Sequence, residues 1–428
     1  MTSRAIAVLL GSLSGVLQAQ TLLFHEDFES GAASSLAANG WTWIGNDPTF
    51  IAGPVSAHAA GRESPDLSVP PISTAHMPLL FHPLPYDPNV YYQVIASLYA
   101  DAPFGSIAVA NAGTGWLTPS GLSMSGVSWS DGSWATPVEF PALPIGPPGV
   151  TGEQFGILLT IGGSATMSHV YFDDLKVVTY PVGQATFAGK VFLDGPFMPG
   201  TGQMSTALGA LSLLPLTEPY SALGYPQIGG GGESATADLL ATDIVDWMRL
   251  ELRSQADPTQ VIATRQVLLA RNGSLLTPFG TSPIVFDAPA GNYHVVVQHR
   301  NHLGILSANA LDLEDAAFAG PQHDFSNAAF PVWGVNARKV VVGGMALWAG
   351  DASSDHMVKY AGAANDRDGI LLAIGGTVPT ATLTGQYRLE DVNLDGIVKY
   401  AGAANDRDVV LQTIGGTLPT STRVEQLP

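Results

Sequence analysis

Hydrophobic and polar residues alternate with a period of two along much of the first 180 residues. The clearest runs span 91–99 and 155–161, and Gly, Pro and Ser residues separate them from their neighbours. Alternation of this kind places every second side chain on the same face of a strand. Short strands between frequent turn residues predict an antiparallel β-sandwich over residues 20–180.

A second group of strand-like segments follows a boundary at residues 180–183, which read Tyr-Pro-Val-Gly. These segments are 188–193, 245–252, 261–270 and 293–299. Asn272-Gly273 lies between two apolar runs and indicates a hairpin with a tight turn. We therefore expect a second, smaller β-sandwich of the immunoglobulin-like kind over residues 185–340.

The last part of the chain, residues 341–428, contains an internal repeat. The sequence VKYAGAANDRD occurs at 358–368 and again at 398–408, with a period of 40 residues. Each copy leads into an apolar segment, 370–374 or 409–414, and then into a Gly-Gly pair, so a short helix is expected there. Units of this size cannot bury a core alone, and the two should pack face to face.

Composition indicates that the chain is exported. Arg4 precedes an apolar stretch at 5–17, and Leu17-Gln18-Ala19 offers a cleavage site, so residues 1–19 read as a secretory signal peptide. No other apolar run reaches the length of a transmembrane helix, and we expect no membrane insertion. The chain has no cysteine, which excludes disulfides and thiolate sites. The net charge of −19 argues against nucleic acid as a partner and is compatible with divalent cations.

The stretch around the second copy of the repeat carries candidate calcium ligands. Oxygen side chains at alternating positions, followed by Gly396, match the first half of a calcium loop, in which alternate side chains turn onto one ion. A standard loop closes with an acid at position twelve, but that position is Gly402 here, so the closing acid should lie further along the chain. The candidate ligands are Asp391, Asn393, Asp395, the carbonyl of Ile397, and Asp406 or Asp408.

The first copy is preceded by a weaker version of the same loop. His356 stands where the second loop has glycine, and Ser replaces the Asn at position three, which makes a poorer ligand. The candidate ligands are Asp351, Ser353, Asp355, Asp366 and Asp368. We expect a lower-affinity site here, or none.

Residues 341–428 resemble the dockerin-like tandem repeats of secreted proteins from Bacteroidetes-type bacteria, in the form with Lys-Tyr-x-Gly and Asn-Asp-Arg-Asp. Dockerins are small calcium-dependent modules that bind a partner protein domain. The resemblance therefore implies Ca²⁺ as the cofactor and a protein partner on the cell envelope or in the matrix. The chain departs from the usual pattern in the inserted closing half of each loop.

Both ends of the first region are strand-like and acidic. Residues 24–29 read Phe-His-Glu-Asp-Phe-Glu, and residues 171–175 read Tyr-Phe-Asp-Asp-Leu. They are similar to the terminal strands of jelly rolls in choice-of-anchor and carbohydrate-binding domains, which implies that these strands pair and share a structural calcium. Acids that converge also need a cation on physical grounds. The candidates are Glu26, Asp27, Glu29, Asp173 and Asp174.

Aromatic and histidine side chains raise two further hypotheses. Trp residues of the first region could stack on sugar rings, although Trp in a sandwich more often belongs to the core. These are Trp41, Trp43, Trp116, Trp129 and Trp134. His294 and His302 would share one face of a strand and His299 the other, which disfavours a three-histidine metal site.

The predicted fold class is mainly β, with an N-terminal jelly-roll sandwich, a second β-sandwich and a small C-terminal dockerin-like calcium-loop module. We expect a secreted or outer-cell-surface protein without catalytic activity, which attaches to a protein partner through the metal-ordered repeat. The alternatives are a glycan-binding adhesin that uses the jelly roll, and an accessory chain of a polysaccharide hydrolase. No Gly-x-Ser-x-Gly or His-Glu-x-x-His motif occurs in the sequence.

Overall fold

The structure is a computed structural model that describes residues 21–43, 47–54, 59–64, 76–100, 105–112, 133–139, 154–162, 168–314 and 322–428. The chain forms two compact units, and the division falls between Val182 and Gly183. The predicted signal peptide, residues 1–19, lies outside the described residues. Among the described residues, no helix combines the length and apolar character that crossing a membrane requires.

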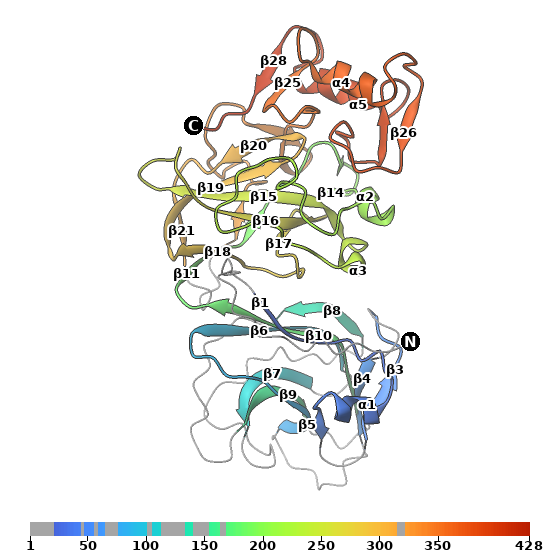
Figure 1. The fold of residues 1–428 in the computed structure, drawn as a ribbon, viewed down its shortest axis with the longest axis vertical. Helices are drawn as coiled ribbons and strands as arrows, with labels where there is room; N and C mark the ends of the chain where they lie inside the picture. The colour runs from blue at the N-terminus through green and yellow to red at the C-terminus, as the bar shows by residue number, and fades with distance from the viewer. Residues whose placement is uncertain are drawn as a thin grey trace. The chain divides into compact units, whose positions relative to one another are not determined.

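The first unit is a sandwich of two antiparallel sheets, which Figure 1 shows as two layers. Its elements are β1 (Thr21–Glu26), α1 (Ala33–Ala38), β2 (Thr42–Trp43), β3 (Thr49–Ile51), β4 (Ala59–Ser64), β5 (His76–Pro83), β6 (Val90–Ala100), β7 (Gly105–Ala112), β8 (Trp134–Glu139), β9 (Gln154–Gly162) and β10 (Ser168–Pro181). One sheet has the order β3-β4-β10-β6-β8, with β1 also paired to β10, and the other has the order β2-β5-β9-β7. From β4 to β10, consecutive strands alternate between the sheets, so the predicted jelly-roll sandwich is confirmed.

Apolar residues from both sheets of the first unit meet in one core. Leu98 and Phe172 of one sheet pack with Leu80 and Ile157 of the other. Trp41, which precedes β2, completes the cluster. The period-two alternation read from the sequence therefore reports which face of each strand is buried.

The second unit is built on a six-stranded antiparallel sheet of order β17-β16-β15-β19-β20, with β21 also paired to β19. Its elements up to residue 324 are β11 (Gln184–Phe187), β12 (Gly189–Lys190), β13 (Phe197–Met198), β14 (Gln203–Met204), α2 (Ala207–Ala210), α3 (Ala237–Leu240), β15 (Ile244–Ser254), β16 (Val261–Ala270), β17 (Leu275–Leu276), β18 (Ile284–Pro289), β19 (Gly291–His299), β20 (His302–Leu306), β21 (Leu311–Leu313) and β22 (His323–Asp324). The strand predicted at 188–193 is shorter than expected, because only β12 pairs as a strand there.

Both faces of the central strand β15 are covered. On one face, Leu250 joins a core that includes Phe187 of β11 and Phe286 of β18. On the other face, Arg249 and Glu251 form a buried ion pair. Successive side chains of a strand point to opposite faces, so one side of this sheet is apolar and the other carries buried charges.

The hairpin turn predicted at Asn272-Gly273 is confirmed between β16 and β17. Gly273 has a φ of +93°, and its amide donates to the Ala270 carbonyl at 2.8 Å. The Asn272 side chain accepts the Ser274 amide at 2.9 Å, which closes the turn.

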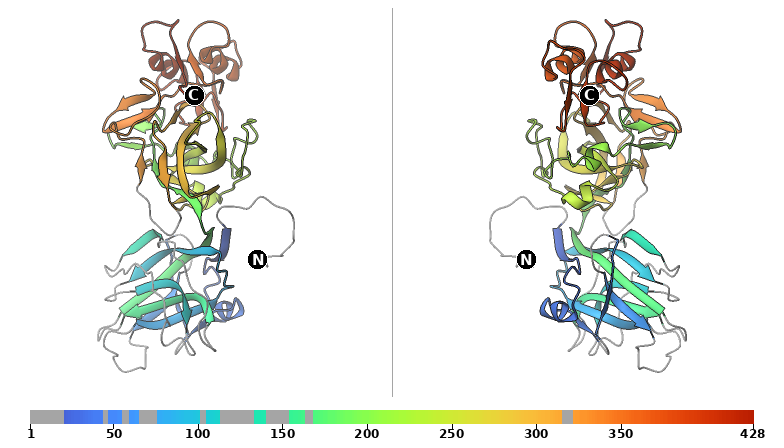
Figure 2. Two further views of the ribbon diagram at one scale, coloured as in Figure 1. Left: turned by 90° about the vertical axis from the view of Figure 1, so that its left-hand side faces the viewer. Right: turned by 90° about the vertical axis from the view of Figure 1, so that its right-hand side faces the viewer.

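The repeat region packs within the second unit. Its elements are β23 (Arg338–Val341), β24 (Gly344–Leu347), β25 (Met357–Lys359), α4 (Asp366–Ala373), β26 (Thr382–Thr384), β27 (Ile397–Lys399), α5 (Asp406–Thr413) and β28 (Thr422–Val424). The repeats exchange strands: β26 of the first pairs with β27 of the second, and β28 of the second pairs with β25 of the first. Helices α4 and α5 lie side by side (Figure 2), as the expected face-to-face packing requires.

The predicted helices begin earlier than the apolar segments that indicated them. They start at Asp366 and Asp406, so the acids of the repeated sequence lie in the first turn of each helix. The Gly pairs end both helices as predicted. The Gly376 amide donates to the Leu371 carbonyl at 2.8 Å, and the equivalent bond forms at Gly416.

Candidate metal centre

The first half of the second loop folds its polar side chains back onto its own backbone. Asp391 is buried, and its two oxygens accept the amides of Asp395 at 3.1 Å and Gly396 at 2.9 Å. The Asn393 oxygen accepts the Asp395 amide at 2.9 Å, and Asp395 accepts the Ile397 amide at 2.9 Å. The alternate polar side chains therefore form Asx turns that cap the backbone of the loop.

Asp406 closes the loop from the first turn of α5. Its carboxylate is buried and accepts the amide of Val392 at 2.9 Å and that of Lys399 at 2.8 Å. Because Val392 follows Asp391 directly, the two buried carboxylates lie inside the same loop. The sequence left the closing acid open between Asp406 and Asp408, and the fold places Asp406 inside.

Asp408 lies on the outer side of the same helical turn. Its side chain is 43% exposed and pairs with Arg407 at 2.8 Å. Asn405, the N-cap residue of α5, donates to it at 2.8 Å. Burial acts to raise the pKa of Asp408, but Asn405 and Arg407 outweigh it and lower the pKa. Asp408 therefore already has a positively charged partner.

The pKa values of the two inner acids, Asp391 and Asp406, are raised, whereas that of Asp408 is lowered. Burial, with the nearby charge of Asp395, raises the pKa of Asp391 to about 6, although Arg300 acts in the opposite direction. Burial, with the charges of Asp391 and Asp395, raises the pKa of Asp406 to about 8. These acids repel one another because the fold holds them close together in a site of low dielectric.

The first loop repeats this geometry. Asp351 accepts the amides of Asp355 at 3.0 Å and His356 at 2.9 Å, and Asp366 accepts the Lys359 amide at 2.8 Å. Burial and the charge of Asp366 raise the pKa of Asp351 to about 7. His356 has a φ of +65°, close to the +82° of Gly396, so the substitution leaves the turn unchanged.

The differences of the first loop lie on its outer side. Ser353 is exposed, and Ser354 lies 2.8 Å from the Tyr225 hydroxyl. His356 pairs with Glu425 at 3.1 Å. Asp368 resembles Asp408, because it pairs with Arg367 at 2.8 Å and its side chain is 58% exposed. The first loop therefore differs from the second in these outer partners and in carrying Ser353 where the second has Asn393.

The donor types of the second loop fit a hard cation. An ionised carboxylate has about four lone-pair positions, so accepting two amides leaves others available to an ion. Among the described residues, however, no three His, Cys, Asp or Glu side chains are already arranged to hold a metal. The fit therefore depends on Asp391 and Asp406, on Asp395 beside them, and on the non-acidic donors Asn393 and the Ile397 carbonyl.

In the first unit, the terminal strands pair as the resemblance implied, and Glu26 lies opposite Leu175. Glu26 is buried, and its carboxylate accepts bonds from the Phe28 amide at 3.2 Å, the Asn39 side chain at 3.3 Å and the Trp41 indole at 3.1 Å. These donors already satisfy Glu26, whose role in the structure is to hold the start of the chain against the core.

The other acids of these strands have partners on the chain as well. Asp174 pairs with His25 at 2.7 Å and with Lys176 at 2.6 Å. Asp173 is buried and accepts the Asp174 amide at 2.8 Å, while Asp27 accepts the Glu29 amide at 3.1 Å. These acids are expected to need a cation if Lys176 is the only basic side chain near them. His25 is a second basic partner, and a calcium here stays a prediction.

The structure bears on the sugar-stacking hypothesis for the Trp residues and on the placing of His299 and His302 in one strand. Trp41 is 1% exposed and belongs to the core, so it is not part of a sugar platform. Trp134 is partly exposed and packs on Tyr99, whereas Trp116 and Trp129 lie outside the described residues. His299 and His302 are neighbours, with their Nδ1 atoms 3.0 Å apart. The sequence predicts one strand through both residues, but the chain turns between them, and His299 of β19 pairs with His302 of β20.

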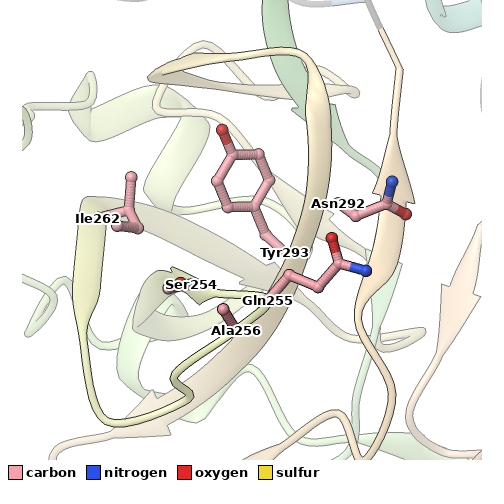
Figure 3. Close-up of a pocket in the computed structure, with 6 residues that line it drawn as sticks. All are labelled: Ser254, Gln255, Ala256, Ile262, Asn292 and Tyr293. Atoms are coloured by element: carbon pink, nitrogen blue, oxygen red, sulfur yellow. The ribbon is translucent and has the colours of Figure 1, made fainter.

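A hollow of about 600 Å³ lies at one end of the strands β15, β16 and β19 of the second unit. Its lining residues are Ser254, Gln255, Ala256, Ile262, Asn292 and Tyr293. Figure 3 shows the Tyr293 ring and the Gln255 side chain between Ile262 and Asn292. The lining offers hydroxyl and amide groups but no acid, base or thiol, and it belongs to neither of the two acidic loops.

Comparisons with known proteins identify no relative from which a function can be transferred. No family model matches the chain, and no curated protein is similar to it. One solved structure that matches is an arabinose-bound α-L-arabinofuranosidase, with 14% identity and a TM-score of 0.24. The match covers 39% of this chain and 27% of that chain. A TM-score this low supports no conclusion about fold or activity.

Proposed function

We propose that this protein binds calcium through its C-terminal repeats and attaches to a protein partner through the surface that the metal orders, without catalysing a reaction. The observation that carries the proposal is the position of Asp391 and Asp406, two buried carboxylates inside one loop. Anions buried together are costly unless a cation balances them. The second loop is the stronger site, and the first is weaker or empty.

In the proposed site, Asp391, Asp395 and Asp406 supply charge, and Asn393 with the Ile397 carbonyl supplies neutral oxygens. Calcium would act as a structural ion that draws these donors together. A short loop without a large core of its own gains folding free energy from such binding.

The attachment part of the proposal rests on the outer surface of the repeats. Both expose an apolar side chain at the same position after the Gly pair, since Val378 is 53% exposed and Leu418 is 63% exposed. Leu372 of α4 is 75% exposed. Apolar side chains on an ordered scaffold are suitable contact points for a protein partner. Export to the medium or the cell surface is also proposed and rests on the signal-peptide pattern.

Calorimetric titration of calcium into the full-length chain, freed of metal with EDTA, tests the first part. We expect calcium to bind with a Kd of about micromolar order. Binding should be lost in Asp391→Asn, and the Kd should change little in Asp351→Asn. Asp257→Asn, which alters an exposed acid between β15 and β16, is the matched control. A wild-type chain that binds no calcium would overturn the proposal.

Binding of the full-length chain to envelopes of the producing cell tests the second part. We expect binding in calcium, loss in EDTA, and loss after the envelopes are treated with protease. Glycan-array binding that Trp134→Ala abolishes would instead support an adhesin that uses the jelly roll. Turnover of a polysaccharide would show that the chain is an enzyme.

A further inference from the structure

The turn between β19 and β20 is buried against the repeats rather than exposed to solvent. Its two residues, Arg300 and Asn301, are 1% and 0% exposed. Connections between strands usually run over the surface, because buried backbone groups need partners. The next residues continue the contact: His302 bridges to Ala349, and the Leu303 amide donates to the Trp348 carbonyl at 2.9 Å.

Asn301 contacts the first residue of both calcium loops. Its side-chain amide donates to the carbonyl of Leu389 at 2.9 Å and to that of Asp391 at 2.8 Å. Its own carbonyl accepts the amides of Gly350 and Asp351, each at 3.2 Å. One residue of the β19–β20 turn therefore holds the start of both loops.

The orientation of the Asn301 side chain is fixed by its neighbours. The Gly195 amide donates to Nε2 of His302 at 3.2 Å, so the proton of His302 lies on Nδ1. That nitrogen is 2.9 Å from the Asn301 oxygen and 3.0 Å from Nδ1 of His299, so these two acceptors share its proton. With its oxygen engaged in this way, Asn301 directs its N–H groups at the second loop.

Arg300 supports the same turn from the other side. It pairs with Asp246 of β15 at 3.0 Å, donates to the Arg388 carbonyl and lies over the Tyr387 ring at 4.1 Å. The Tyr387 hydroxyl donates to Asp246 at 2.6 Å. The segment that leads into the second loop is thereby joined to the sheet on which Asn301 lies.

We infer that Asn301 is a positioning residue for both calcium loops, which fixes Asp391 through its side chain and Asp351 through its main chain. The inference rests on the proposed function for its connection to calcium. Groups that orient the ligands of a metal site commonly change its affinity by about 10- to 100-fold when they are removed. Asn301 thus couples the two loops to each other and to the central sheet.

The test compares Asn301→Ala with wild type and with Thr264→Val in the full-length chain. Thr264 is a buried residue of β16 whose hydroxyl bonds Gln227 and Ile228, so its change removes buried hydrogen bonds elsewhere in the same sheet. We expect Asn301→Ala to weaken calcium binding about tenfold, with the affinity of Thr264→Val unchanged. Equal affinities in Asn301→Ala and wild type would overturn the inference.

A second readout needs no metal. In EDTA, amide hydrogen exchange at 395–396, whose N–H groups bond Asp391, should become faster in Asn301→Ala, while exchange in β16 stays unchanged. If the wild type binds no calcium, the proposed function fails and this exchange still decides whether Asn301 positions the loop. Unchanged exchange at 395–396 would exclude the positioning role. If Asn301→Ala does not fold, Asn301→Leu replaces it, because Leu has a similar size and branching, lacks the N–H donors and adds no charge.

Discussion

Asp406 and Asp408 show how two acids of the same type, two positions apart, come to have opposite environments. The helix α5 begins at Asp406, so the first acid points back into the loop and the second lies on the outer side of the turn. Arg407 and Asn405 balance the outer acid, whereas the inner acid has only main-chain amides. Position within the first helical turn, rather than residue type, decides which acid belongs to the loop.

This difference makes Asp406→Asn and Asp408→Asn a matched pair. In Asp406→Asn an uncharged amide faces the amides of Val392 and Lys399, so calcium binding should weaken by at least about tenfold, or about 1.4 kcal/mol. Asp408→Asn should keep the wild-type affinity within about threefold. Calorimetry at a temperature at which both variants are folded measures this, and an equal loss in both variants would contradict the assignment.

Asp246 provides a prediction about pH. Burial acts to raise its pKa, but Arg300, His299 and Tyr387 outweigh burial and lower the pKa to about 2. Because this folded-state value is below the model-compound value of 3.8, the ion pair stabilises the fold fully above about pH 4. The contribution is lost as the pH falls from there toward about 2.

Urea unfolding in EDTA at pH 5, 4, 3 and 2 checks this for wild type and Asp246→Asn. At pH 5 the variant should be less stable by about 3–5 kcal/mol, because Arg300 loses the partner of a buried pair. The difference should narrow as the pH falls from about 4 toward 2, because the carboxyl of the unfolded chain takes up its proton before that of the folded chain. A constant difference across the series would show that Asp246 does not have a depressed pKa.

At the scale of elements, the exchange of strands explains how two small repeats form a stable pair. Leu383 of the first repeat lies opposite Val398 of the second, and Arg423 of the second lies opposite Val358 of the first. Neither repeat completes its own two-stranded sheet. The identical stretches of the two repeats also have nearly identical backbones, with a φ of +50° at Ala364 and +51° at Ala404.

The close contact between Gly195 and Val392 of the second loop leads to another prediction. A Cβ on Gly195 would lie 2.1 Å from the Val392 carbonyl oxygen, whereas a Cβ on Gly200 would meet nothing within 4 Å. Gly195→Ala should therefore destabilise the second unit by about 1–3 kcal/mol through overpacking and weaken calcium binding at the second loop. Gly200→Ala, five residues further on, should change neither quantity. Thermal unfolding measures the stability and calorimetry measures the calcium affinity. If Gly195→Ala and Gly200→Ala do not differ in either quantity, Gly195 is not tightly packed against Val392.

Some elements of the second unit can be predicted from the sequence, and one turn cannot. Strand periods, the Asn272-Gly273 turn and the Gly pairs that end the helices are local signals, and the predictions based on them are confirmed. The turn between His299 and His302 has neither Gly nor Pro, so the sequence predicts one continuous strand through these residues. Burial of that turn by the repeats stabilises it, and a contact between distant segments leaves no local pattern in the sequence.

At the scale of the whole molecule, the repeats and the central sheet form one compact unit. Leu394 of the second loop belongs to the core of the central sheet, and Leu303 of β20 belongs to the core of the repeats. Residues 341–428 alone would lack Leu303 and Asn301 and would expose Leu394. The two loops therefore depend on the rest of their unit for packing.

Calcium should consequently stabilise the whole of residues 183–428 and not the repeats alone. Differential scanning calorimetry of the full-length chain should show one transition whose midpoint temperature rises with calcium. When calcium is at 100 times Kd, the free energy of unfolding should increase by about 2.7 kcal/mol. A second transition, that of the first unit, should stay in place unless its acids also bind calcium. A separate, smaller transition for residues 341–428 would contradict this coupling.

The sequence by itself determined the mainly β class, the jelly-roll and repeat regions, and the spacing of acids that indicates calcium, because these depend on residues close together in the chain. Only the tertiary structure decided that Asp406 faces the loop, that Trp41 lies in the core and that His299 lies beside His302. It alone brought Asn301 to the carbonyl of Asp391, 90 positions away. Contacts of this kind depend on how elements pack, and the free energy of packing is shared among many residues of both elements.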